Sequence, residues 1–419
     1  MKIAVIGSGI AGLAAAWHLD RGGVEVHLIE PGLRIGSHAH TQVLPVQEGS
    51  ISIDTGFSVF NTQSCPRFHG WLKAMGVATR PSTMDVAVCI QSEALDLALA
   101  GFATLATSLP LLFRPGHWRI RQDTRRLSAE LLCARHSEQR LGEYLDQHRY
   151  SREFIDVLLS PLLSAHWPQT DTCVLDLPLT AVQSLLRDQQ LLHSVGDSSW
   201  QRVAGGTQAY LQAFETQFSG TIHTNSSVSA VRREGHRAHL IRDAKAETYD
   251  GTVFACDGES VLKMLADAND AERAVLAQTP HQYGDVYLHG DQSFMPRNSK
   301  SWSSRNVITT GGGAHLMTYW MNRIYGLGCS EQLFLTLNPD RVPQRVRWQG
   351  SYLQPEADLS AQWLQQRWQS VSSPETCFAP AFSGHGMHED GFVSGMLCAE
   401  SLLHLAASDA DARNRASAA

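Results

Sequence analysis

The feature that most constrains this chain is a glycine-rich turn at residues 7–12, Gly-Ser-Gly-Ile-Ala-Gly. An apolar run at residues 2–6, typical of a buried parallel strand, comes directly before it. A helical pattern at residues 11–21 follows and ends at two glycines, and residues 24–30 form a second strand-like run. Strand, helix and strand in this order predict a βαβ unit and therefore a parallel sheet.

The spacing of these glycines is typical of a turn that holds the pyrophosphate of a dinucleotide. Gly7 permits the tight turn, Gly9 lets the backbone approach the phosphates, and Gly12 lets the helix pack closely on the sheet. Glu30, which ends the second strand, is placed to accept hydrogen bonds from a ribose. A glycine turn without a ligand is the alternative, and the surrounding βαβ unit argues against it. The cofactor contacts predicted here are Gly7, Gly9, Ile10, Ala11, Gly12 and Glu30.

The next segments resemble the glutathione-reductase-type FAD proteins, specifically their amine oxidase and phytoene desaturase branch. Residues 34–41, Arg-Ile-Gly-Ser-His-Ala-His-Thr, resemble an extension in which an arginine and glycines continue the pyrophosphate cradle; Ser37 stands where the family has a second glycine. Residues 54–57, Asp-Thr-Gly-Phe, resemble a turn that approaches the isoalloxazine ring. The resemblance implies FAD, bound noncovalently. It implies further contacts at Arg34, Gly36, Ser37, His38, Thr41, Gly56 and Phe57.

The C-terminal part of the chain resembles the same family. Residues 378–380 and 384–395 are similar to its final FAD segment, in which the start of a helix points at the flavin pyrimidine. After Phe-Ala the family usually has a glycine and an acidic residue, where this chain has Pro380 and Ala381. Residues 203–207 resemble the central piece of the domain. The contacts implied by these segments are Val228, Glu389, Asp390 and Gly391.

Together these patterns predict an α/β fold, with a Rossmann-type FAD-binding domain and an inserted α+β substrate domain. A chain of 419 residues exceeds the size that one hydrophobic core usually supports. We expect the FAD-binding domain in three pieces, residues 1–76, 196–262 and 373–419, the last with a C-terminal tail. The substrate domain then takes residues 77–195 and 263–372.

Composition excludes several other classes of protein. Hydrophobic residues make up 43% and charged residues 18% of the chain, as in an ordinary globular protein. A net charge of −7 without a long basic tract argues against a nucleic-acid partner. The eight cysteines form no CxxC pair, and no HExxH, paired Cys/His or GxSxG pattern occurs, so we expect no metal, disulfide framework or hydrolase serine. The chain start has no signal-peptide pattern, and Asp96, Gly101 and Pro110 interrupt the longest apolar stretch, which favours a cytoplasmic protein.

Four residues are candidates for catalysis. Amine oxidases place a lysine near flavin N5, and Lys300 is the lysine of this chain in a strand-rich substrate segment; a solvated loop lysine is the alternative. Tyr319 and Asn322 lie in an expected alternating strand, where they form a pocket wall or pack in the core. His388 stands in the last FAD segment, where it either moves protons or bonds a backbone carbonyl.

The expected function is that of an FAD-dependent oxidoreductase that removes a hydride from a hydrophobic substrate. Within the superfamily, the strings at residues 54–57, 318–323 and 388–391 resemble a bacterial group of predicted FAD-binding proteins. Genes of that group often neighbour cyclopropane fatty acid synthase-like genes, which implies a modified fatty acyl lipid. A small or secondary amine is the alternative substrate, and a flavoprotein with structural or non-redox use of FAD is the alternative class.

Residues 95–126 suggest a second partner, an anionic lipid surface at the inner membrane face. An apolar run there ends in a basic, tryptophan-bearing edge, which is how a peripheral helix meets lipid. The alternative is an amphipathic helix packed on the core with a solvated basic face. The edge consists of Arg114, His117, Trp118, Arg119, Arg121, Arg125 and Arg126.

Overall fold

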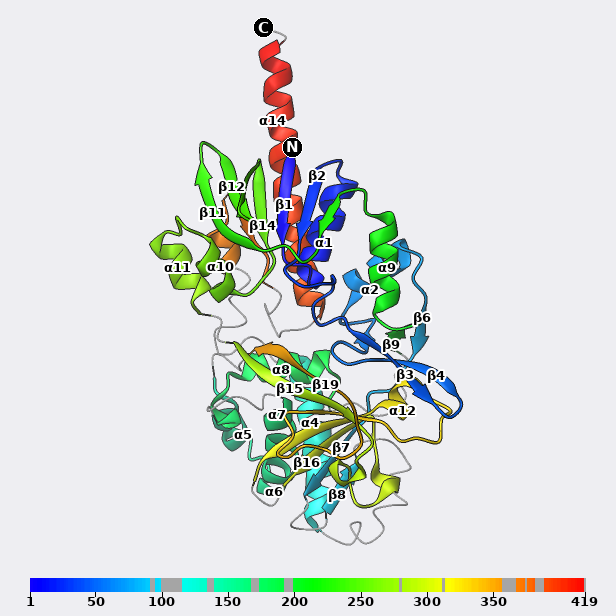
Figure 1. The fold of residues 1–419 in the computed structure, drawn as a ribbon. Helices are drawn as coiled ribbons and strands as arrows, with labels where there is room; N and C mark the ends of the chain where they lie inside the picture. Colours follow the sequence, from blue (N-terminus) through cyan, green and yellow to red (C-terminus); the bar gives the residue numbers. More distant parts are fainter. Residues whose placement is uncertain are drawn as a thin grey trace.

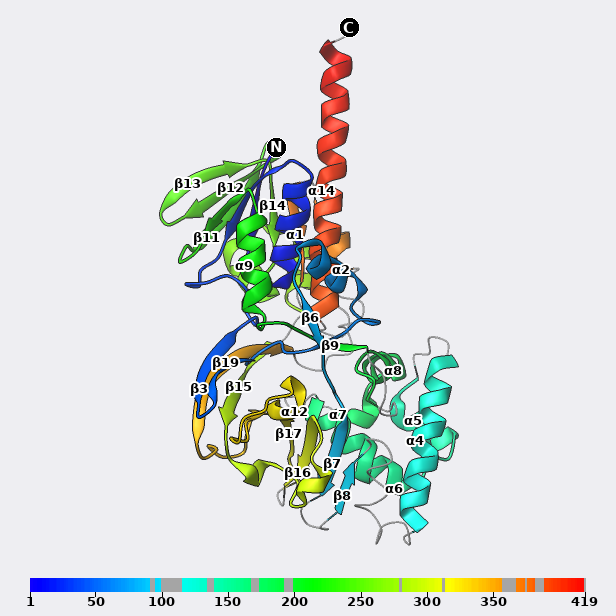
Figure 2. The same cartoon turned by 90° about the vertical axis from the view of Figure 1, so that its right-hand side faces the viewer.

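The computed structural model of the chain has two layered bodies joined by several strands (Figure 1). One body carries the N-terminal strand and the long C-terminal helix, and the other carries a larger mixed sheet (Figures 1 and 2). The structure describes residues 1–90, 95–98, 115–133, 139–166, 173–191, 199–278, 281–310, 313–355, 367–373, 375–380 and 388–417.

The first body is built on a five-stranded parallel sheet. In sheet order its strands are β10 (Thr221–His223), β2 (Glu25–Ile29), β1 (Lys2–Ile6), β14 (Gly251–Phe254) and β20 (Thr376–Phe378). Alternate residues of β1 enter different cores, because successive side chains of a strand point to opposite faces. One core packs under the helices α1 (Ile10–Arg21), α2 (Pro66–Ala74), α9 (Gln208–Gln217) and α14 (His388–Ser417).

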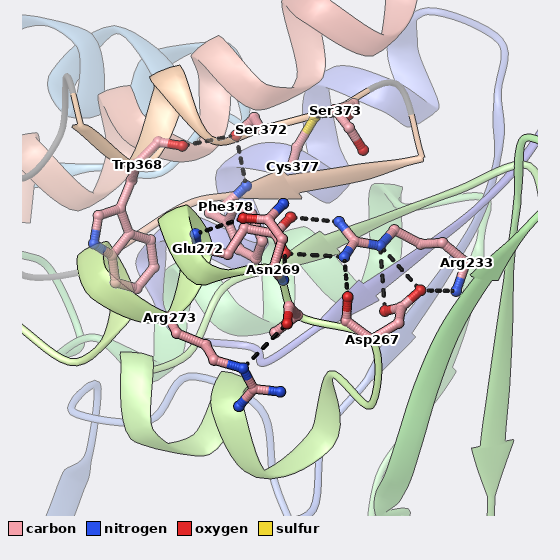
Figure 3. Close-up of polar contacts among 11 residues, drawn as sticks. Arg233, Asp267, Asn269, Glu272, Arg273, Trp368, Ser372, Ser373, Cys377 and Phe378 are labelled. Atoms are coloured by element: carbon pink, nitrogen blue, oxygen red, sulfur yellow. Dashed lines mark hydrogen bonds and ion pairs between the residues drawn. The ribbon is translucent and has the colours of Figure 1, made fainter.

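The other face of this sheet is covered by an antiparallel meander and two short helices. These elements are β11 (Val228–Glu234), β12 (Arg237–Arg242), β13 (Lys245–Tyr249), α10 (Gly258–Met264) and α11 (Asp270–Leu276). Arg233 of β11 reaches the buried Glu272 of α11 and also Asp267 in the loop before that helix, as Figure 3 shows. Asn269 begins α11 with a capping box that uses the same glutamate. One arginine therefore fixes α11 against the meander.

The second body is built on a seven-stranded sheet. Its order is β19 (Val346–Pro355), β15 (His281–His289), β18 (Phe334–Leu337), β17 (His315–Trp320), β16 (Arg305–Thr309), β7 (Val86–Ile90) and β8 (Leu95–Ala98). Only the β16–β7 pair within this sheet is parallel. The elements α4 (Pro115–Cys133), α5 (Leu141–Gln147), α6 (Arg152–Phe154), η3 (Ile155–Leu159), α7 (Ser160–His166), η4 (Val174–Asp176) and α8 (Leu179–Asp188) supply the helical layer on one face.

Smaller elements connect the two bodies. A three-stranded sheet of β5 (Phe60–Asn61), β9 (Trp200–Val203) and β6 (Thr79–Pro81) lies between them (Figure 2). The hairpin of β3 (Thr41–Val46) and β4 (Gly49–Asp54) packs with the helix α12 (Met321–Tyr325) on the other face of the large sheet. The 3₁₀ turns η5 (Gln292–Phe294) and η6 (Ser299–Ser301) complete the described elements of the second body.

Asp54, the last residue of β4, joins four segments of this junction. Its Oδ1 accepts hydrogen bonds from the Thr41 hydroxyl at 2.5 Å, and from the backbone N–H and hydroxyl of Thr207 at 2.9 and 2.8 Å. Its Oδ2 accepts one from the Tyr325 hydroxyl at 2.8 Å. Burial raises the pKa of this carboxyl, and the four donors oppose that rise.

The predicted α/β fold is confirmed, and so are the strand at residues 2–6 and the helix and strand that follow it. The strand expected to continue through residue 322 is wrong, because β17 ends at Trp320 and α12 begins at Met321. The Met321 N–H still bonds the Leu333 carbonyl in the register of the β17–β18 ladder, but the Leu333 N–H donates to the side-chain oxygen of Asn322, so the ladder ends there. The limits of the five predicted domain pieces stay a prediction.

A glycine on the C-terminal helix offers a test of this packing. A Cβ added to Gly395 would lie 1.9 Å from the carbonyl oxygen of Ala11 in α1. We therefore expect Gly395→Val to lower the free energy of unfolding by about 1–3 kcal/mol, through overpacking of α1 against α14. Gly70→Ala is the matched control, because a Cβ there meets nothing within 4 Å. That control replaces an exposed glycine in α2 by a better helix former, so it should raise the free energy of unfolding by about 1 kcal/mol. Equal unfolding midpoints in denaturant for Gly395→Val and the parent protein would contradict the close approach.

Candidate cofactor and active site

A cavity of about 880 Å³ opens at the carboxyl ends of β1 and β2. The glycine turn and Glu30 line one part of it, and residues of β15 and β19 line the side that faces the large sheet. Such crevices at the ends of parallel strands are where α/β sheets bind ligands, and this volume is typical of a ligand pocket. The cavity thus brings both bodies of the fold to one site.

The three glycines of the turn serve different purposes. Gly7 has a φ of +100°, which favours glycine, and a Cβ on Gly12 would lie 1.9 Å from the Gly7 carbonyl oxygen. Gly9 has an ordinary φ of −62° and a Cβ there would meet only Ser37, at 3.7 Å. The protein itself therefore has room for a side chain at Gly9, and that room belongs to the cavity. Gly9 is also the N-cap of α1, so the first N–H groups of this helix have no capping side chain.

Glu30 is held in position by the turn that it faces. Its Oε2 accepts hydrogen bonds from the backbone and hydroxyl of Ser8, at 3.0 and 2.5 Å, and its Oε1 accepts one from the Gly32 N–H at 2.8 Å. A carboxylate has about four acceptor sites, so capacity remains for ribose hydroxyls. Val228, at the start of β11, lines the cavity close to this end.

The loop after β2 continues the cavity wall through backbone conformations that are unusual for side chains. Gly36 has a φ of +108° and Ser37 a φ of +50°, so the position where the family has its second glycine is left-handed here too. A Cβ on Gly56 would lie 2.1 Å from the His38 carbonyl oxygen. Gly36, Ser37, His38 and Gly56 all line the cavity, and their contact with the cofactor stays a prediction.

Arg34 and Thr41, predicted as cofactor contacts, lie outside the cavity lining, as do Ala11 and Gly12 of the helix α1. Arg34 is exposed, and its Nη1 donates to the Ala39 carbonyl at 2.9 Å. The Thr41 hydroxyl is bound to Asp54. Both residues support the loop and hairpin that form the wall, so the structure gives them a part in holding the shape of the cavity.

His388 and Phe57 form the aromatic end of the cavity. Their rings stack at 3.6 Å between centroids with a 6° interplanar angle, and the edge of Phe68 meets His388 at 4.6 Å. The Nε2 of His388 is inaccessible to solvent and has no hydrogen-bond partner within the described residues. Burial, helped by His38, lowers the pKa of His388 to about 3, so its imidazole is neutral near pH 7. A neutral ring with one unpaired nitrogen is able to accept or donate a hydrogen bond to a bound group.

Glu389, predicted as a cofactor contact, has a structural partner instead. Its two carboxylate oxygens accept hydrogen bonds from the N–H groups of Arg67 and Phe68, at 2.8 and 3.0 Å. These are the first N–H groups of α2 after Pro66, so Glu389 caps that helix. Neither Asp390 nor Gly391 is among the described residues that line the cavity. The start of α14 nevertheless reaches the cavity through His388.

The other candidates for catalysis lie away from the cavity. Lys300 is exposed on η6, which contradicts its expected place beside the flavin. Asn322 fixes a loop, because its amide donates to the Glu331 carbonyl at 2.7 Å and accepts from the Leu333 N–H at 2.8 Å. Tyr319 lies near the end of β17, the central strand of the large sheet, opposite Arg305, and it is partly buried. Of the four, only His388 lines the described cavity.

Sequence reasoning missed three aromatic residues that line the cavity, Tyr283, Tyr352 and Trp368. Tyr352 of β19 stacks on His38 at 5.1 Å, and its hydroxyl lies 2.8 Å from that of Thr55. Trp368 is fully buried beside Phe378, and its Nε1 has no partner among the described residues (Figure 3). Alternation in β19, which puts Trp348 and Tyr352 on one face, was the signal available in the sequence.

These features fit FAD. The cavity offers an approach without side chains at Gly9, an uncapped helix start, a fixed carboxylate at Glu30 and an unpaired nitrogen at His388. The first two match the pyrophosphate of the cofactor, Glu30 matches the ribose, and His388 matches the flavin. No cluster of ligands for a metal ion occurs within the part of the chain that the structure describes.

Comparison with known proteins gives one family and several similar structures. The sequence model of a family described as flavin containing amine oxidoreductase matches residues 10–412. Cyclohexylamine oxidase from Brevibacterium oxydans has a TM-score of 0.69 at 14% identity, over 96% of this chain and 98% of that one. A CLA-producing fatty acid isomerase from P. acnes has a TM-score of 0.68 at 15% identity, over 94% and 97%. Putrescine oxidase has a TM-score of 0.66 at 12% identity, over 96% and 99%.

The TM-scores show that this chain shares its fold with these proteins over nearly the whole length of each. No curated protein matches the chain.

Gly9 allows the binding function of the turn to be separated from its folding function. Because a Cβ at Gly9 points into the cavity and clashes with nothing in the protein, we expect Gly9→Val to fold normally and to lose its cofactor. The melting temperature of the cofactor-free protein should stay unchanged, while the increase that FAD produces in the parent should disappear. Gly12→Val is the contrasting variant. It should lower both the melting temperature of the cofactor-free protein and the increase that FAD produces, because a Cβ there clashes with Gly7. Equal FAD content in purified Gly9→Val and parent protein would contradict the assignment.

Proposed function

This chain belongs to the flavin-containing amine oxidoreductase family and is an FAD-dependent oxidoreductase, and from this premise we propose that its substrate is a hydrophobic molecule with a fatty acyl chain. Bound FAD supplies the hydride acceptor. The uncapped start of α1 and the backbone at Gly9 would hold its pyrophosphate, and Glu30 would hold the ribose. Oxygen or another acceptor would have to take the electrons from the reduced cofactor.

The chain's own residues would prepare the reacting end of the cavity. Phe57, His388 and Phe68 form an aromatic wall that excludes water. His388 is neutral near pH 7, so it would position a polar atom by one hydrogen bond without adding charge. Excluding water strengthens every such contact, because the local dielectric constant falls.

The observation that carries the proposed substrate class is the aromatic and apolar lining where the cavity meets the large sheet. Tyr283, Ser351, Tyr352 and Leu353 line this side. Lys263, the one lysine among the described lining residues, lies at the other end of the cavity, with Asp257 and Ser260. Tyr283 is 74% exposed, so this side is open at its rim, and its aromatic and aliphatic surface suits an acyl chain. The fold likeness to a fatty acid isomerase supports this choice.

Two alternatives keep specific support. The likeness to cyclohexylamine oxidase and putrescine oxidase favours an amine, whereas the exposed position of Lys300 removes the residue proposed to act near flavin N5. The isomerase likeness also favours a reaction without net oxidation. The three reactions differ in which substrate, if any, leaves the flavin reduced when it is mixed with the protein without oxygen.

Anaerobic mixing distinguishes them directly. We expect the flavin absorbance of the FAD-loaded protein to bleach when oleoyl lipids are added without oxygen, because the hydride remains on the cofactor. Amines of similar length should leave it unchanged. Bleaching by the amines alone would replace the lipid by an amine, and conversion of lipid without bleaching would indicate isomerisation. Boiled protein with free FAD is the control.

The proposed lipid substrate is a further reason to consider the basic face of α4 as a membrane contact. Trp118 is 57% exposed there, and Arg119 and Arg125 are exposed too, Arg119 in an exposed ion pair with Glu153 of α6 at 2.7 Å. Arg126 points inward, where it pairs with Glu130, so it does not contribute to this face. The part of the predicted stretch at residues 99–114 lies outside the described residues. We propose that this face of α4 contacts anionic lipid at the cytoplasmic membrane surface; among the described helices none is long and apolar enough to span a bilayer.

Vesicle sedimentation tests the contact. The protein should sediment with vesicles that contain anionic phosphatidylglycerol and much less with neutral ones, and salt should weaken binding, because each surface cation contributes about 1 kcal/mol. Changing Arg119, Arg121 and Arg125 together to glutamine should release the protein while its FAD content stays the same, because α4 does not line the cofactor cavity. A parent protein that ignores anionic vesicles at low salt would show that α4 is an ordinary solvated helix.

A further inference from the structure

Two histidines meet at the edge of the parallel sheet. His27 lies on β2, and His223 is the last residue of the edge strand β10. The Nδ1 of His27 lies 3.0 Å from the Nε2 of His223, and the ring centroids are 5.1 Å apart. Neither histidine is among the described residues that line the cofactor cavity. The two imidazoles are therefore hydrogen-bonded to each other outside that cavity.

Only one N–H fits between these two nitrogens. When both rings are neutral, one nitrogen donates and the other accepts. One added proton preserves this contact, because an imidazolium is able to donate to a neutral imidazole. A second added proton makes both nitrogens donors and places two positive charges on adjacent strands. The pair thus accommodates one extra proton and excludes another.

The acids around the pair offer little to stabilise a second charge. The Oε1 of Glu25 lies 3.2 Å from the Nε2 of His27, but the Glu25 side chain is 62% exposed, so water screens it. The carboxylate of Glu247 is already engaged, because it pairs with Arg242 and accepts a hydrogen bond from the Tyr249 hydroxyl at 2.5 Å. One screened carboxylate is enough for one imidazolium.

Cations on the neighbouring strands oppose protonation as well. Burial lowers the pKa of His223 below its ordinary value of 6.5, and the charges of Arg242 on β12, of His27 and of Lys2 on β1 lower it further, while Glu247 opposes them. A histidine whose pKa is lowered by the fold binds fewer protons than it does in the unfolded chain. Its contribution to stability is therefore complete above pH 6.5 and is lost as the pH falls below that value.

Both strands of the pair lead directly into the wall of the cofactor cavity. Glu30 comes three residues after His27, Ser226 comes three residues after His223, and both line the cavity. The Glu30 N–H donates to the His223 carbonyl at 2.8 Å, and the Ser226 N–H donates to the Glu30 carbonyl at 3.0 Å. Asp243, another acid near His223, accepts from the Ser226 hydroxyl at 2.6 Å. Separation of β10 from β2 would break the contacts that hold the ribose end of the cavity.

We propose that the His27–His223 pair makes retention of the cofactor depend on pH. Protonation of both rings separates β10 from β2 and loosens Glu30, so the protein holds FAD near pH 7 and releases it under mildly acidic conditions. The inference concerns the cofactor alone and does not depend on the proposed substrate.

Release of FAD from the loaded protein tests this. The protein is diluted to a series of concentrations at about pH 7.5 and at about pH 5.5, on either side of the ordinary pKa of histidine, and released FAD is measured by its fluorescence. The Kd of the parent protein should rise about tenfold between the two values, because uptake of one proton changes a binding constant by up to about tenfold per pH unit. His27→Gln and His223→Gln, which keep a hydrogen-bonding side chain without a titratable group, should each reduce this rise to less than about threefold.

His239→Gln is the matched control. His239 lies on β12 of the same meander and contacts the Thr248 hydroxyl at 3.1 Å. This variant should keep the full pH dependence of the parent. His38 and His388, which line the cavity, are present in all of these proteins, so their own effect on the Kd cancels in the comparison.

Hydrogen exchange supplies a second measurement, which needs no variant. In the FAD-loaded parent protein, acidification should reduce the protection of the β10 amides more than that of the β14 amides, which belong to the interior of the same sheet. A parent Kd that is the same at both pH values, or a pH dependence that both glutamine variants keep, would overturn the proposal. If neither variant retains FAD at about pH 7.5, equal losses of protection in β10 and β14 would overturn it instead.

Discussion

The arrangement of the two bodies depends on one buried carboxylate. Asp54 accepts four hydrogen bonds from a neighbouring strand, from the start of α9 and from the end of α12. No cation of the described part of the chain forms an ion pair with it, so the burial cost is offset by neutral donors alone. Loss of one donor would leave a charge with incomplete solvation. The positions of the four donors around Asp54 are therefore fixed, and they determine how the β3–β4 hairpin is oriented relative to the cofactor cavity.

Arg305 is the opposite case within the same molecule. Asp54 has every acceptor position used, whereas Arg305 keeps a free Nε beside a tyrosine with a free hydroxyl. Both residues lie near the boundary between the bodies, one closing it and the other facing the helical layer.

The parts of the site that follow local backbone rules could be predicted from the sequence. Gly7, Gly9 and Glu30 lie where a βαβ unit requires them, and their positions depend only on neighbouring residues. Glu389 and Asn322 were misread because their partners come from elsewhere: the former caps a helix more than 320 residues away, and the latter fixes a loop that no periodicity marks.

Lys300 and Arg305 make the same point about charge. Both are cations in the strand-rich second half of the chain, and no local pattern tells which one is solvated and which is buried. That difference arises only when β16 takes its place beside β7, a strand more than 200 residues earlier. Long-range pairing, which a single sequence does not reveal, decides what a charged residue does.

The cap that Glu389 places on α2 has a consequence for the order in which this protein is made. Glu389 belongs to the last helix, and the strand β20 that completes the parallel sheet comes just before it. During synthesis the first strand, the glycine turn and α2 leave the ribosome long before either partner exists. A nascent chain therefore carries half of a cofactor site, with an open sheet edge and an uncapped helix, for almost the whole of translation. Because such edges invite pairing with other chains, the early strands are exposed to aggregation until β20 and α14 have been made.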